Sequence, residues 1–208
     1  LELIAAARST DRGAISALIA DGVDVNTRYG DGTTALHWAA HRDDESLVRL
    51  LIGAGADVNA TDDHGVAALS LACVNGSETV VRTLLDAGAD ANAARTSGET
   101  PLMSAARVGN VDVVRLLLAG GADPNTTEAT LEQTALMLAV AENHTRVAGV
   151  LIEVGATVTA RSTNQFTPLL FAVQQGNIDA ARLLLSAGAD VNESAPEGIG
   201  GNTNARTR

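Results

Sequence analysis

The chain has 208 residues, of which 46% are hydrophobic and only 2% aromatic, with one cysteine and a formal net charge of −11 at pH 7. This apolar content excludes a disordered chain, the single Cys73 excludes a disulfide framework, and the negative charge disfavours nucleic-acid binding. No apolar run approaches the roughly 18 residues that a membrane span needs, so we expect a soluble protein without membrane insertion.

The first predicted helix lies at the N-terminus, in the string Leu1-Glu-Leu-Ile-Ala-Ala-Ala7. The chain begins without Met, a basic segment or a signal-like apolar core, so we expect an internal segment of a longer protein. Its compartment, cytoplasmic or exported, is therefore left open by the sequence. The 38 alanines indicate helices that pack close together, because small side chains let backbones approach.

Two strings recur with the same period along the rest of the chain. A Gly-Ala-Asp-Val-Asn-like string starts at Gly22, Gly55, Gly88, Gly121, Gly155 and Gly188. A Thr-Ala-Leu-like string starts at Thr34, Ala67, Thr100, Thr134 and Thr167. Each interval is 33 residues except one of 34, which places one extra residue between Thr126 and Gln133. The agreement of two independent strings predicts a repeat protein.

Each period contains two short helical patterns. The first begins at the Thr, whose hydroxyl can cap free N–H groups, and Pro101 and Pro168 suit a first helical turn. The second is an apolar run such as Val113–Leu118, and a glycine follows it where a left-handed residue costs least. Neither helix reaches the ~12–15 residues at which an isolated helix becomes marginally stable. Stability must therefore come from stacking each helix pair on its neighbours.

These strings closely resemble the ankyrin repeat family over residues 1–192. The resemblance implies an all-α solenoid of about six stacked helix–turn–helix pairs with β-hairpin-like fingers, forming a single domain. The expected repeats are 1–26, 27–59, 60–92, 93–125, 126–159 and 160–192. The string from Asp31 to Trp38 is similar to those of bacterial ankyrin proteins, which are often exported.

Departures from the family pattern gather near the C-terminus. Thr157 and Thr159 replace the usual Asp and Asn, and Gln165 stands where a finger glycine is expected, so the fifth finger should lose bracing hydrogen bonds. The run Ala180–Leu185 is as apolar as an internal repeat, and a solenoid needs a polar terminal face. We therefore expect further sequence after Arg208, and residues 193–208 should be a flexible tail or the start of a further repeat.

The chemistry-bearing residues favour structural roles. His37 and His41 have the i, i+4 spacing of a helical zinc site and His64 could approach them, but the helix lacks the Glu that zinc hydrolases use. The resemblance implies instead that His37 is a structural residue that bonds to a neighbouring finger. Cys73 falls at a small-residue core position and is expected to be an inert thiol. No triad-like signature or phosphate loop is present in the sequence, so we expect neither catalysis, nor a cofactor, nor a metal.

The resemblance implies that a partner would lie on a concave face made by the finger tips and the outward side of the first helices. All four aromatic residues and several arginines map to that face by register. Aromatic and Arg side chains dominate interface hot spots. The candidate partner-binding residues are Arg28, Tyr29, Trp38, His41, Arg95, Arg107, Arg161, Phe166 and Phe171. Half-buried packing between adjacent helices is the alternative role for Trp38 and Phe171.

The sequence thus predicts a non-catalytic, monomeric scaffold that binds an unidentified protein on its concave face. A targeting or regulatory segment of a larger enzyme or effector is one alternative. A small-molecule or metal binder centred on His37, His41 and His64 is another. A designed repeat protein is disfavoured because the fifth repeat drifts and one period has 34 residues.

Overall fold

The structure, a computed structural model, describes residues 1–194; most of the tail expected at 193–208 lies outside that range. Within the described residues the chain forms twelve helices and no strand. Their order is α1 (Glu2–Ser9), α2 (Arg12–Ala20), α3 (Ala35–His41), α4 (Glu45–Gly53), α5 (Ala68–Asn75), α6 (Glu78–Asp86), α7 (Pro101–Val108), α8 (Val111–Ala119), α9 (Ala135–Ala141), α10 (Thr145–Glu153), α11 (Pro168–Gln175) and α12 (Ile178–Ser186).

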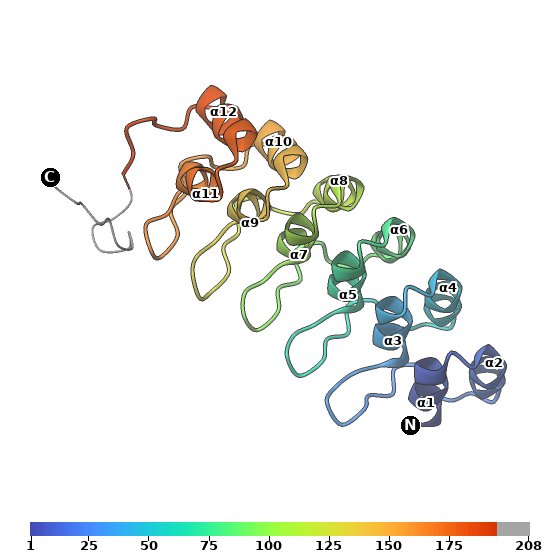
Figure 1. The fold of residues 1–208 in the computed structure, drawn as a ribbon. Helices are drawn as coiled ribbons and strands as arrows, with labels where there is room; N and C mark the ends of the chain where they lie inside the picture. Colours follow the sequence, from blue (N-terminus) through green and yellow to red (C-terminus); the bar gives the residue numbers. More distant parts are fainter. Residues whose placement is uncertain (195–208) are drawn as a thin grey trace, which may run out of the picture.

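The helices form two layers that run the length of the molecule (Figure 1). Odd-numbered helices stack on one another in one layer, and each packs against the even-numbered helix that follows it in the chain. A long loop connects each pair to the next, and all five loops project on the side of the odd-numbered helices. The prediction of an all-α solenoid is therefore confirmed.

Threonines at the starts of the odd-numbered helices act as predicted. The hydroxyls of Thr100, Thr134 and Thr167 each accept a hydrogen bond from the backbone N–H three residues on. Ala67 occupies the same position before α5 and has no side chain that can form this cap. Side chains of Asp11, Asp44, Ser77, Asn110 and Asn177 cap even-numbered helices in the same way.

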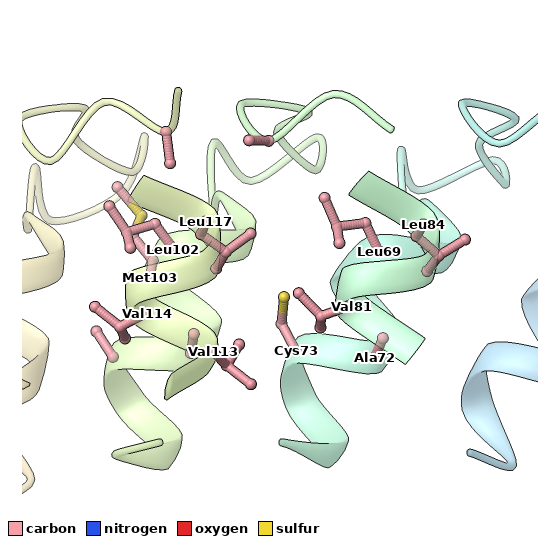
Figure 2. Packing of buried hydrophobic residues seen from close by; sticks show 14 of the residues in the cluster. Leu69, Ala72, Cys73, Val81, Leu84, Leu102, Met103, Val113, Val114 and Leu117 are labelled. Carbon is pink, nitrogen blue, oxygen red and sulfur yellow. The ribbon is translucent and has the colours of Figure 1, made fainter. Parts of the chain in front are cut away.

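The core lies between neighbouring pairs and is built from aliphatic residues. Small residues such as Ala72 and Cys73 on α5 are fully buried, as are Val81 and Leu84 on α6. Figure 2 shows these side chains with their counterparts on α7 and α8, which repeat the same arrangement one pair further along the stack. Close approach of the odd-numbered helices explains why the core contains alanines and no aromatic ring.

The inter-pair loops, named here for the segments that connect α2 to α3, α4 to α5, and so on, share one closure. In the second loop the Asp62 N–H donates to the Val66 carbonyl at 3.0 Å. In the fourth loop the matching bond joins Glu128 to Gln133, so it spans five residues instead of four. The extra residue of the 34-residue period is therefore accommodated inside this loop.

Neighbouring loops are also bonded to one another. The Asp63 N–H donates to the Asp31 carbonyl at 3.0 Å, and equivalent bonds link each later loop to the one before it. Gln165, at the position of the finger glycines, adopts a left-handed φ of 63°, as do the glycines it replaces. The five loops thus form a continuous array, which holds their exposed side chains at regular spacing.

The final pair differs from the internal pairs in exposure. Val173 on α11 is 65% exposed, whereas Cys73 and Val140 at the equivalent internal positions are fully buried. The reason is geometric, because within residues 1–194 no further helix pair packs against this side of α11 and α12.

Candidate interaction surface

The loop face is defined here as the inter-pair loops together with the adjoining sides of the odd-numbered helices. Because the loops project from one side only, residues far apart in the sequence form a single surface (Figure 1). Every residue that the sequence identified as a partner contact lies in a loop or on an odd-numbered helix. In structural order these are Arg28 and Tyr29, Trp38 and His41 on α3, Arg95, Arg107 on α7, Arg161 and Phe166, and Phe171 on α11.

The first group on the loop face surrounds Trp38. The Trp38 and His41 rings meet edge to face, with centroids 5.9 Å apart. The guanidinium carbon of Arg8, on α1, lies 4.8 Å from the centre of the Trp38 ring. Trp38 also packs against the hydrophobic core and its buried Nε1 has no acceptor among the described residues, so the indole has a structural role as well as an exposed edge.

Arg8 is a loop-face residue that the sequence reasoning missed. It lies one period before His41, in the same series that continues to Val74 and Arg107. Extending that series by 33 residues toward the N-terminus would have identified it.

Arg28 and Tyr29 lie in the first loop and differ in how firmly they are held. Arg28 Nη2 donates to the Thr61 carbonyl of the next loop at 2.6 Å, which ties the two loops together. Tyr29 is 47% exposed. Tyr29 is therefore available to a partner, whereas Arg28 already serves the loop array.

A pocket of about 250 Å³ lies beside Trp38, between the first two inter-pair loops. Its apolar walls come from Trp38, Leu71 and Val66, and its polar groups come mainly from the carboxylates Asp31 and Asp62. Thr33 donates two hydrogen bonds to Asp31, and these lower the pKa of that carboxyl, so Asp31 is ionised at neutral pH. These two aspartates were not among the sequence candidates, because only stacking brings Asp62 of one repeat beside Trp38 of the preceding one.

The middle of the loop face carries a charged group centred on Glu99. One oxygen of Glu99 lies 3.5 Å from Arg95, and the other accepts a hydrogen bond from the Ser104 hydroxyl at 3.1 Å and lies 4.0 Å from Arg107. Two candidate arginines are thus brought together around one carboxylate. Arg95 is only 25% exposed in this group, whereas Arg107 is 50% exposed.

The C-terminal part of the loop face brings Phe166 and Phe171 together. Their ring centroids are 5.4 Å apart with a tilt of 51°. Both rings are half-buried and line a second pocket of about 180 Å³ with polar neighbours such as Gln133 and Gln174. Arg161 donates to the Gln165 carbonyl at 3.0 Å and is otherwise exposed. The candidates therefore divide into three groups on the loop face.

His37 belongs to the connection between repeats. Its Nδ1 accepts from the Thr34 N–H at 3.1 Å, and its Nε2 donates to the Val66 carbonyl at 2.8 Å. Both ring nitrogens are therefore engaged, and burial lowers the pKa of His37, so the ring is neutral at neutral pH. In the part of the chain that the structure describes, no three His, Cys, Asp or Glu side chains come close enough to hold a metal ion.

Cys73 is fully buried on α5, and burial raises the pKa of its thiol to about 12. Since the thiolate is the reactive form, this environment suits packing and opposes nucleophilic chemistry. None of the helices within residues 1–194 is long and apolar enough to cross a membrane.

Comparison with known proteins gives one match. A family model described as ankyrin repeats (3 copies) matches residues 3–95 and again residues 102–195. A search of curated proteins found no match. The two matched ranges together take in all twelve helices.

Proposed function

The chain belongs to the ankyrin repeat family, and from that membership we propose that it is a non-catalytic scaffold that binds a partner protein on its loop face. Ankyrin repeats generally mediate protein–protein interaction, and the family is typically non-catalytic. The proposal further treats residues 1–192 as one binding domain and the protein as a monomer.

The single observation that carries the proposal is the gathering of all four aromatic residues on the loop face, with none in the core. Tyr29 and the Phe166–Phe171 pair lie at opposite ends of this surface, with the arginines around Glu99 between them. Rigid aromatic rings and arginines are enriched at interface hot spots. Because the loops are bonded to one another, these side chains are held in place before binding, which lowers the entropy lost on association.

The test compares two variants of similar charge. The loop-face variant combines Tyr29→Ala, Arg107→Ala and Arg161→Ala, three exposed positions whose replacement should leave the fold unchanged. The control combines Arg115→Ala and Arg182→Ala, exposed positions on the even-numbered helices. Both remove two positive charges, so they share the same change in net charge.

Affinity capture from a native lysate, quantified by mass spectrometry, should show proteins that the wild type and the control retain and the loop-face variant loses. If instead the control loses them and the loop-face variant retains them, the partner binds the even-numbered helices and the proposed face is wrong. Identical retention by all three would also contradict the assignment.

A second candidate role is a targeting or regulatory segment of a larger enzyme or effector. It uses the same loop face and differs in what the scaffold is attached to, so it would be tested by identifying the sequence that flanks this segment in the native protein.

A further inference from the structure

The pocket beside Trp38 combines a flat aromatic wall with two carboxylates. Trp38 and Leu71 provide apolar surface, and Asp31 and Asp62 provide negative charge. An opening of about 250 Å³ is large enough for one long side chain. None of the residues that line it is an arginine, and the chain contains no lysine, so nothing in the lining neutralises the two carboxylates directly.

The indole of Trp38 already receives one cation from within the chain. Arg8 reaches it from α1, on the side of the preceding helix pair. The pocket lies toward the following pair, since its remaining walls come from Asp62, Val66 and Leu71. A guanidinium stacks favourably on an indole because the ring face carries negative charge density. The side of Trp38 that faces the pocket therefore offers a second cation the same kind of contact.

The two carboxylates have oxygen atoms to spare. Asp31 accepts its two hydrogen bonds, from the Thr33 N–H and hydroxyl, on Oδ1. Asp62 also uses Oδ1, for the N–H groups of His64 and Val66. Within residues 1–194 no hydrogen bond to either Oδ2 is present. These loop bonds fix the orientation of both carboxylates, which favours a planar donor group that can contact both.

Neighbouring basic groups do not compete for this position. Arg28 lies close by, but its Nη2 is bonded to the Thr61 carbonyl. His37 lines the pocket in its neutral form, because burial lowers its pKa. His41 meets the Trp38 ring edge to face and is exposed. The net charge of −11 adds a long-range attraction for a basic partner.

We propose that this pocket binds an arginine side chain of the partner protein, with the guanidinium stacked on Trp38 and hydrogen-bonded to Asp31 and Asp62. The inference rests on the proposed function, because it assigns one contact of the loop-face partner. Arginine is favoured over lysine because a planar guanidinium can stack on the indole and donate to two carboxylates at once.

The probe is N-acetylarginine amide, titrated into the whole chain while Trp38 is observed. Trp38 is the only tryptophan, so its fluorescence and its indole N–H resonance report on this pocket alone. We expect a saturable change with the arginine probe, and about tenfold weaker responses with N-acetyllysine amide and with N-acetylleucine amide. Equal responses to all three probes would overturn the proposal.

The decisive variant is Asp31→Asn with Asp62→Asn, which keeps side-chain size and removes both charges. It should weaken arginine binding by about tenfold or more, since the charge-assisted hydrogen bonds are lost. Asp112→Asn with Asp179→Asn, at exposed sites on α8 and α12, makes the same change in net charge and should bind as the wild type does. Thermal unfolding of both variants shows whether they remain folded. If the first variant unfolds, the single Asp31→Asn change carries the same expectation with a smaller loss.

The two proposals can fail separately. If the arginine probe binds as expected but the loop-face variant still captures every partner, the pocket assignment stands and the proposed function is wrong. If the probe produces no saturable change while the loop-face variant loses its partners, the function stands and the arginine assignment is wrong.

Discussion

Arg8 and Trp38 connect the first two helix pairs through a cation–π contact, with 4.8 Å between the guanidinium carbon and the ring centre. The contact joins α1 to α3 on the exposed side of the stack, where few other side chains do so. It also sets the electrostatic environment of the only tryptophan, which makes its effect measurable.

Arg8→Ala should destabilise the protein by about 0.5–1 kcal/mol, the usual range for an exposed cation–π contact. It should also shift the Trp38 emission maximum to longer wavelength, because the ring face becomes open to water. Urea unfolding and emission spectra measure the two effects. Arg115→Ala, at an exposed site on α8, is the control and should change neither; a matching shift in the control would contradict the assignment.

His37 should make stability depend on pH below neutrality. Burial lowers its pKa in the folded protein from an ordinary value of 6.5. The unfolded chain therefore binds a proton more readily, so stability is complete above pH 6.5 and falls as the pH drops toward the folded pKa.

Urea unfolding between pH 7.5 and 5 measures this dependence. The slope should become shallower in His37→Gln and stay unchanged in His64→Gln, which replaces an exposed loop histidine. An equal slope in His37→Gln and wild type would show that another group is responsible.

Cys73 should resist thiol reagents in the native protein. With a pKa of about 12, only about one thiol in ten thousand is ionised at pH 8, and the side chain is fully buried. Labelling with a disulfide reagent should therefore be slow and limited by opening of the fold, and it should become fast in concentrated urea. Rapid labelling without denaturant would mean that α5 is not packed as described.

Asparagine side chains form a ladder between successive repeats that stops at Thr159. Asn59 Nδ2 donates to the Gly88 carbonyl and its Oδ1 accepts from the Asp90 N–H, and Asn26, Asn92 and Asn125 do the same one period away. At the last step Thr159 makes neither bond within the described residues.

Thr159→Asn should therefore stabilise the protein by about 1 kcal/mol, because it can bond to the Gly188 carbonyl and the Asp190 N–H. The reverse change at an internal step, Asn59→Thr, should destabilise by about as much or more, since it leaves two backbone groups without partners. Thermal unfolding tests both. A loss of stability in Thr159→Asn would show that the last pair is not stacked in the same register as the others.

Much of the fold could be predicted from sequence because its period is local. The Thr100 and Thr167 caps, the prolines that follow them and the glycines after the second helices each act within a few residues. The same periodicity placed Tyr29, Trp38 and Phe171 on one face, and it would have placed Arg8 there had the series been extended. What register could not give is the neighbour of each side chain.

The sequence by itself determined the repeat, the helix pairs, the aliphatic core and the face on which the aromatic residues lie, because these depend on spacing along one chain. The tertiary structure alone decided that Asp62 shares a pocket with Trp38, that Arg95 and Arg107 meet at Glu99, and that both nitrogens of His37 are occupied. Those contacts depend on the distance and rotation between stacked pairs. That geometry arises from side-chain packing across repeats, which spacing in the sequence does not encode.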